Sequence, residues 1–282
     1  MLPNWHRLAV SLLLAAVMVA ISLFLRNPGL ARTSAYPLVR ALAALSTERQ
    51  TRDWAVIESE HFRLKYRPED ADIAPLVLVT AEEAYGPVTS RLNYRPRGKS
   101  LILLYPDRVS LARQFGWAAD ESAMGVYWAG VIRILSPYDW VSGEDKEEIA
   151  RIFRKDGPMV HEFAHLIVDG RTRGNYPRWL TEGIAQYLER EVTGFEMPRP
   201  AGAGQVYNLE ELDARFDDLP DQNLAYRQSL ELVEYIIKCY GWDALDDLLN
   251  ALGSGTTFNK AVQKILGQSA TSLLEAYKSQ AL

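Results

Sequence analysis

The order of apolar and polar positions in the first half of the chain predicts a strand followed by a helix. Within residues 54–68, the apolar positions Phe62, Leu64 and Tyr66 alternate with polar ones, which is typical of a strand. Residues 72–94 then carry apolar side chains three or four positions apart, which is the spacing of a helix with one buried face. We therefore expect a strand and a helix in succession at the start of a folded unit.

Two further apolar runs extend this unit. The run SLILLYPD follows shortly after Gly98 and is short and continuous enough for a buried strand. The run GVYWAGVIRILSP, residues 125–137, predicts a hairpin that turns near Gly130 and returns along VIRIL. Residues 53–140 are therefore predicted to form a small mixed α/β unit with an antiparallel edge.

The pattern changes to helix after Gly143. The triplet from Asp156 to Pro158 predicts a helix start, with Asp156 as the cap and Pro158 in the first turn. The predicted helices carry the segments EDKEEIARIFRK, HEFAHLIV, WLTEGIAQYLEREV, LAYRQSLELVEYIIKCYG, ALDDLLNALG, TTFNKAVQKILG and ATSLLEAYKSQ. Residues 141–282 are therefore predicted to be mainly helical, and the fold class of the chain is α+β.

The first thirty residues contain a long stretch without charge. Leu8 to Leu25 would make a helix roughly 27 Å long at about 1.5 Å per residue, which is close to the thickness of a bilayer core. A cleaved signal peptide is the alternative, with a small-residue site at residues 29–31, but its apolar core is usually shorter. We predict a retained N-terminal signal anchor at residues 1–30.

The remainder divides into a linker and one folded domain. Residues 31–52 are predicted as a juxtamembrane linker with a short helix at ALAALSTER, and residues 53–282 as the domain. Arginines lie on both sides of the apolar stretch, so the positive-inside rule alone does not give its orientation. Because an N-terminal anchor usually exports a large C-terminal domain, we predict a single-pass protein of the cell membrane, held through residues 8–25, with the domain outside the cytoplasm.

Charge and cysteine content narrow the range of partners. The net charge of −5, without a long basic tract, argues against a nucleic-acid partner. The single cysteine, Cys239, cannot form an internal disulfide. Its neighbours LELVEYIIKCYGW form an apolar helical pattern, which predicts a buried, unreactive thiol.

The segment HEFAH carries the chemistry of this sequence. His161 and His165 are four residues apart, so a helix places both on one face, where they can bind one metal ion. Glu162 is rotated by about 100° from His161 and can reach a water on the metal without binding the metal itself. The alternative interpretation is an ordinary helix that happens to carry two histidines.

A catalytic zinc usually has a third protein ligand. Val168 and Arg171 occupy the positions where a metzincin would have glycine and histidine, so that arrangement is excluded. The other histidines, His6 and His61, are poorly placed. Glu182 lies in the first turn of an apolar helix, where burial of a carboxylate is costly unless it binds a cation. An acid that interacts only with the helix dipole is the alternative.

With HEFAH followed by WLTEGIA, the chain resembles the gluzincin metallopeptidases, and most closely the peptidase MA-like group of bacterial proteins. The resemblance extends over roughly residues 53–280 and identifies residues 53–282 as a peptidase MA-like catalytic domain with a zincin C-terminal half. It implies one Zn²⁺ ion held by His161, His165 and Glu182. It also implies a peptide or protein substrate, whose amide bond is hydrolysed by a zinc-bound water that Glu162 activates.

The resemblance also suggests the supporting residues. Gluzincins often stabilise the oxyanion with a Tyr or His from the downstream helices, and Tyr226 is at the family-like place, with Tyr187 and Tyr176 as weaker alternatives. Gln186, one turn after Glu182, is expected to orient His161. Trp179 is expected to pack in the core.

By analogy with the family, the returning strand VIRIL is expected to be the edge that pairs with an extended peptide. Two other functions are left open by the sequence. One is a non-catalytic zincin-fold protein that binds a partner, against which the intact Glu162 argues. The other is a zinc hydrolase of non-peptide substrates.

Overall fold

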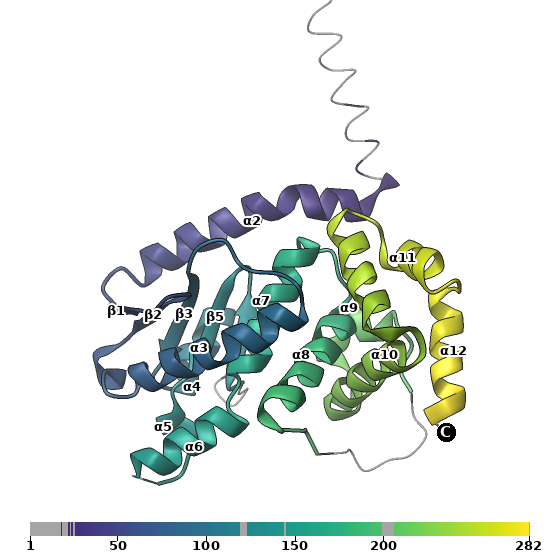
Figure 1. Ribbon diagram of the computed structural model, residues 1–282. Helices are drawn as coiled ribbons and strands as arrows, with labels where there is room; N and C mark the ends of the chain where they lie inside the picture. Colours follow the sequence, from purple (N-terminus) through teal and green to yellow (C-terminus); the bar gives the residue numbers. More distant parts are fainter. Residues whose placement is uncertain are drawn as a thin grey trace, which may run out of the picture.

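The computed structural model describes residues 26–118, 123–143, 145–198 and 206–281, together with the single residues 18, 22 and 24. It places a sheet on one side of the molecule and a group of helices on the other, with α2, Pro28–Gln50, running across the top of both (Figure 1). Most of the predicted membrane segment, residues 8–25, lies outside the described residues. Within the described part, no helix is long and apolar enough to cross a bilayer.

The sheet is mixed and has five strands in the order β1-β2-β3-β5-β4. Their bounds are Ala55–Glu58 for β1, Phe62–Tyr66 for β2, Ser100–Tyr105 for β3, Gly125–Trp128 for β4 and Val131–Leu135 for β5. The three central strands are parallel, whereas β1 and β4 pair antiparallel at the two edges. The predicted α/β unit with an antiparallel edge is therefore confirmed.

Two details of the predicted strands are wrong. The stretch 54–68 forms two strands, because the chain reverses between Ser59, whose N–H donates to the carbonyl of Phe62, and that residue. His61 therefore lies in the turn and not in a strand. VIRIL, which is β5, is not an edge: it lies between β3 and β4, and all five of its residues are buried. The edge strand of this hairpin is β4.

The helices follow the predicted periodicities closely. The bounds of the α-helices after the first strands are Ala74–Arg91 for α3, Arg108–Phe115 for α4, Pro137–Trp140 for α5, Lys146–Asp156 for α6, Met159–Thr172 for α7, Arg178–Thr193 for α8, Glu211–Ala214 for α9, Gln222–Gly253 for α10, Phe258–Ile265 for α11 and Ala270–Ala281 for α12. Short 3₁₀ turns span Pro68–Asp70 (η1) and Phe216–Asp218 (η2). The predicted cap at Asp156 is wrong, since Asp156 ends α6 and Pro158 precedes α7 without a side-chain cap.

One apolar core joins the sheet to the helices. The ring of Phe163 on α7 meets Phe62 of β2 edge-on, with 5.1 Å between centroids, so the helix that carries HEFAH packs directly on the sheet. Trp179 is fully buried against Phe258, as expected for a packing residue. Cys239 is exposed, however, because α10 turns it away from the core, so the prediction of a buried thiol is wrong.

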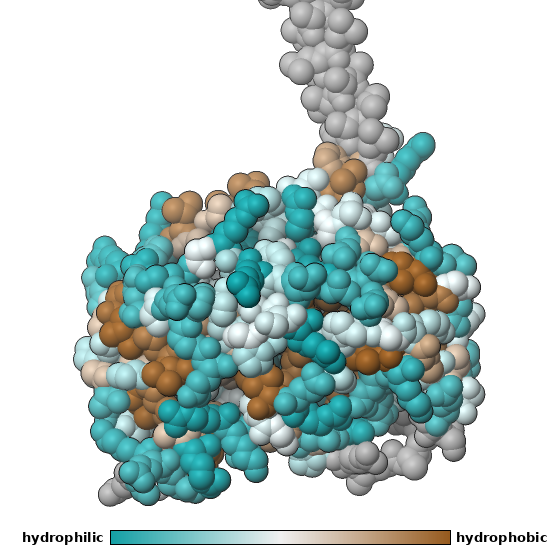
Figure 2. Space-filling model, in the orientation of Figure 1, coloured by the Kyte–Doolittle hydropathy of each residue, from teal (hydrophilic) through white to brown (hydrophobic). Residues whose placement is uncertain are grey.

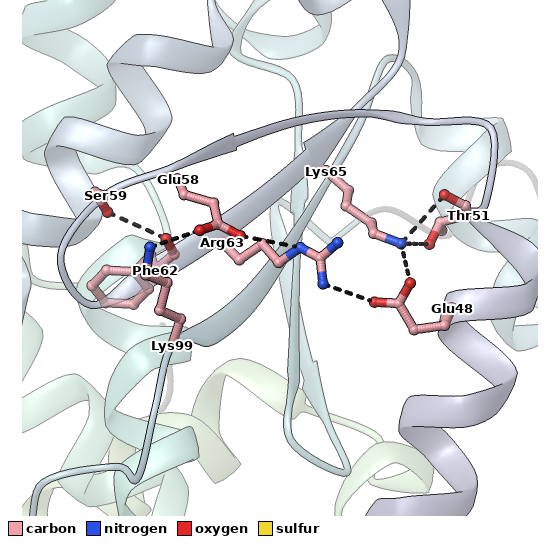
Figure 3. Close-up of polar contacts among 8 residues, drawn as sticks. All are labelled: Glu48, Thr51, Glu58, Ser59, Phe62, Arg63, Lys65 and Lys99. Carbon is pink, nitrogen blue, oxygen red and sulfur yellow. Dashed lines mark hydrogen bonds and ion pairs between the residues drawn. The ribbon is translucent and has the colours of Figure 1, made fainter.

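The helix α2 occupies the stretch that the sequence predicts as a linker. Its last turn is tied to the sheet, where the Nζ of buried Lys65 lies 2.5 Å from Glu48 Oε2 and also donates to Thr51 Oγ1 at 3.0 Å (Figure 3). Glu48 lies 3.5 Å from the guanidinium of Arg63 as well. Residues 28–50 are thus a 23-residue helix docked on the domain, longer than the short helix that ALAALSTER suggests.

Candidate metal centre

The two histidines of α7 share one helix face. His161 and His165 lie one turn apart, with their ring centroids separated by 4.7 Å. Each presents its Nε2 to the same atom of α8: Glu182 Oε2 is 3.4 Å from His161 Nε2 and 3.5 Å from His165 Nε2. One ligand atom from each of the three residues lies within 4.8 Å of the others, so the structure brings together the three predicted ligands.

The carboxylate of Glu182 indicates that a cation fits here. The residue is only 1 % exposed, and its Oε2 atom has no hydrogen-bond partner among the described residues. Burying an ionised oxygen without a partner destabilises the folded state by roughly several kcal/mol, unless a cation compensates the charge. Two imidazole nitrogens and one carboxylate oxygen are the donor set of a catalytic zinc site with one open position.

Hydrogen bonds at the opposite ring nitrogens fix the orientation of both histidines. His165 Nδ1 is 2.7 Å from Thr181 Oγ1, and His161 Nδ1 is 3.3 Å from Glu189 Oε2. Such contacts leave each Nε2 for the metal. Gln186 does not serve His161, because its amide donates to the main-chain carbonyl of Tyr226 at 2.8 Å. The predicted role of Gln186 is therefore wrong, and Glu189 takes that place.

Glu189 could have been found from its spacing. It lies seven residues after Glu182, which is two turns along the same face of a helix. Gly183 lets α8 pack closely against α10, because a Cβ at this position would lie 2.1 Å from the carbonyl oxygen of Ser229 on α10. Since only glycine permits this approach, α8 is held between α7 and α10 with its acids turned toward the histidines.

Glu162 lies beside the histidines, under the edge strand. It is 6 % exposed, and a Cβ on Gly125 of β4 would come within 2.8 Å of its Oε1. Burial raises the pKa of Glu162, while the neighbouring His161 and His165 lower it in part. The carboxylate is therefore a stronger base than an exposed glutamate, in a site where β4 leaves room for it.

An arginine determines the charge state of the third predicted ligand. Burial alone would raise the pKa of Glu182, but Arg178, whose Nε is 3.0 Å from Oε1, together with the histidines, holds it well below its usual value. Burial likewise opposes charge on His161, yet Glu189 and Glu182 outweigh burial and raise its pKa. The site as a whole is built to attract positive charge.

Of the three candidate tyrosines, Tyr226 is the one whose pKa responds to the acids of this site. The negative charge of Glu182, followed by burial, raises its pKa, and Glu162 contributes in the same direction. Tyr176 instead lies with its hydroxyl 3.4 Å from Asp169 Oδ1, and Tyr187 packs against Trp242.

The helical part of the chain, which carries these residues, is similar to a known protein family. Residues 148–281 match the family model described as Peptidase MA superfamily. This helical part of the chain is therefore similar to the peptidase MA superfamily. The match confirms the resemblance drawn from HEFAH and WLTEGIA; it begins at residue 148 and so leaves out the α/β unit.

A solved structure with a similar chain course is a point mutant of the M1 zinc metallopeptidase from Deinococcus radiodurans. The similarity has a TM-score of 0.36 and 16 % sequence identity, and it covers 81 % of this chain but 51 % of that peptidase. The chain thus spans about half the length of this structural neighbour. No curated protein matches the sequence.

Proposed function

We propose that this protein is a membrane-anchored zinc metallopeptidase that hydrolyses peptide bonds. The observation that carries the proposal is the buried Oε2 of Glu182, which has no hydrogen-bond partner among the described residues and faces the Nε2 atoms of His161 and His165. The match of residues 148–281 to the peptidase MA superfamily and a buried glutamate next to His161 support the same reaction class.

In the proposed reaction, His161, His165 and Glu182 hold the zinc ion. Bound zinc supplies Lewis-acid polarisation of the scissile carbonyl and of the attacking water. Glu162 takes the proton of that water and passes it to the leaving amine, for which its raised pKa suits it. Tyr226 donates a hydrogen bond to the developing oxyanion. Thr181 keeps the ring of His165 oriented during the reaction.

We also propose that the peptide pairs with β4. This strand is the edge of the sheet, and its first residue, Gly125, lies against Glu162. An extended peptide added to that edge would form main-chain hydrogen bonds and lie next to the base. The edge strand also exposes Trp128, an apolar surface for a substrate side chain. This replaces VIRIL as the binding strand.

The membrane part of the proposal rests on the uncharged segment from Leu8 to Leu25. It is long enough for a signal anchor, and we propose that it holds the catalytic domain at the outer side of the cell membrane.

Zinc content and peptide hydrolysis together test the proposal. The full chain is purified in detergent beside Glu182→Ala and Glu162→Gln. We expect about one tightly held zinc per wild-type chain, weaker binding in Glu182→Ala, and in Glu162→Gln full zinc content with no cleavage of a peptide library. A folded, reconstituted wild type without zinc would contradict the metal site. Zinc without cleavage of any peptide would favour a binding protein or a hydrolase of other substrates.

A further inference from the structure

The outward side of α2 is an apolar surface. Every exposed residue between positions 34 and 45 is uncharged. The four largest of these side chains belong to Leu38, Val39, Leu42 and Leu45, with exposed fractions of 64, 47, 58 and 56 %. We call this surface, residues 34–45 of α2, the α2 outer face. Leu38, Leu42 and Leu45 are spaced by four and three residues and so form one stripe. Brown side chains mark it along the upper margin of the molecule (Figure 2).

The opposite side of α2 is fixed to the domain, so the outer face cannot turn inward. Tyr36 donates its hydroxyl hydrogen to Asp169 Oδ2 at 2.8 Å, and Arg40 donates to the Tyr36 hydroxyl at 2.8 Å. Arg40, the single charged residue between positions 33 and 47, is thereby drawn to the inner side. Glycine at position 29 lies against the main chain of Gly255, where a Cβ would clash.

The position of α2 in the chain, directly after the proposed membrane segment, indicates that a bilayer covers the α2 outer face. The helix begins at Pro28, three residues after the uncharged segment that ends at Leu25. With 23 residues, α2 is roughly 35 Å long. If the preceding segment is in the bilayer, the helix that starts three residues later, with its apolar outer face from residue 34, lies next to the headgroup region.

The charges around the outer face fit an anionic surface. Arg26 and Arg32 are exposed near the start of α2, and Arg49 is exposed near its end. Glu48, the one acid of the helix, is held by Lys65 on the sheet side. An apolar stripe with arginines at both ends is the composition of helices that lie in the plane of a membrane and bind anionic lipid headgroups.

We propose that the α2 outer face lies in the headgroup region of an anionic phospholipid bilayer and seats the domain flat against it. The inference rests on the proposed anchoring by residues 8–25 and is independent of the proposed peptidase activity. The helix α2 also contacts Asp169, which lies one turn after His165 on α7. Membrane contact would therefore fix how the metal centre is oriented relative to the bilayer.

Depth-dependent fluorescence quenching tests this inference on the full chain. The exposed Cys239 is replaced by Ser, and one cysteine at a time is introduced and labelled with an environment-sensitive fluorophore. Leu42→Cys probes the outer face, Val17→Cys the apolar segment, and Val79→Cys is the matched control, because Val79 is an exposed residue of α3 (47 %) away from α2. Each protein is reconstituted in vesicles of phosphatidylcholine and phosphatidylglycerol that contain brominated lipids.

We expect bromolipid quenching at Leu42 several-fold above that at Val79, and strong quenching at Val17. Quenching at Val17 with Leu42 equal to Val79 would overturn the inference and leave the anchoring intact. No quenching at either Val17 or Leu42 would overturn both. A label at Leu42 that is shielded in proportion to protein concentration, without lipid quenching, would mean that a second copy covers the face and would also overturn the inference.

Discussion

Arg178 and Glu182 form an ion pair within one turn of α8, with 3.0 Å between Nε and Oε1. This contact occupies one carboxylate oxygen and leaves the other, Oε2, facing His161 and His165. The guanidinium also lies over the ring of Phe216, 5.6 Å from its centroid. Arg178 is therefore positioned to hold Glu182 ionised and to direct a single oxygen toward the two histidines.

Replacing Arg178 is expected to weaken zinc binding without unfolding the protein. Arg178→Gln should lower zinc affinity by about 10- to 100-fold, the usual effect of removing a partner of a metal ligand, and Arg178→Lys should lower it less. Competition with a chelator measures the affinity. Arg154→Gln is the control, because Arg154 pairs with Glu83 at the surface away from the site. Equal affinities in all four proteins would contradict this role.

The hydroxyl of Tyr226 is expected to act on the transition state. Tyr226→Phe should keep the fold and the zinc but lower kcat by about 10²- to 10³-fold, with KM little changed, because only the oxyanion contact is lost. Steady-state kinetics on a cleaved peptide measure both constants. Tyr187→Phe removes a hydroxyl from the same helical region, where the ring packs on Trp242, and should leave both constants unchanged. A reduced zinc content in Tyr226→Phe would assign Tyr226 to the metal instead.

A methyl group at position 125 is expected to displace the base. In Gly125→Ala, the added Cβ would lie 2.6 Å from Glu162 Cγ and 2.8 Å from Pro158 Cβ, so Glu162 has to move. Turnover should fall by about 10²-fold, because a misplaced base loses its geometry, whereas zinc content should not change. Gly86→Ala, where the new Cβ meets nothing within 4 Å, is the control. Full activity of Gly125→Ala would show that β4 does not constrain Glu162.

The buried Asp70 is expected to make stability fall as pH rises. Burial raises its pKa, and the hydrogen bond from Ser136 Oγ, 2.6 Å long, offsets this only in part. The folded state therefore holds this proton more tightly than the unfolded chain, so the cost of ionising Asp70 is absent below the unfolded pKa and complete above the raised one. Asp70→Asn should be more stable than wild type by about 1 kcal/mol at neutral pH, with no advantage in acid.

Urea unfolding at about pH 7 and about pH 2.5, which is below the pKa of an unfolded Asp, measures this difference. Asp72→Asn is expected to lower the free energy of unfolding at neutral pH, the opposite of Asp70→Asn, because the hydrogen bonds from Lys146 and Tyr138 lower the pKa of Asp72. Its contribution is present at neutral pH and is lost as the pH falls through the lowered pKa. A stability gain for Asp70→Asn that persists in acid would point to packing and not to charge.

The residues of the candidate metal site could be found from the sequence because their spacing is a local property. The four-residue period of a helix puts His161 and His165 on one face whatever surrounds it, and an acid in the first turn of an apolar helix marks Glu182. The helices of the second half were predicted for the same reason. Tyr226 was suggested by family resemblance, and the charges of Glu182 and Glu162 raise its pKa.

Only the tertiary structure decided how these elements face one another. Which strand is the edge depends on the pairing of β3 with β5, and which side of α10 is covered decides that Cys239 is exposed. Glu189 replaces Gln186 as the partner of His161 because the rotation of α8 is set by its close approach to α10 at Gly183.

The chain's own pattern thus determined that there is a helix with two histidines, a second helix with an acid, and an uncharged segment near the N-terminus. The docking of α2 across the domain, the burial of Glu182 between α7 and α10 and the position of Gly125 over Glu162 came from contacts between residues far apart in the chain. Such contacts depend on packing and sheet order, which no local periodicity encodes.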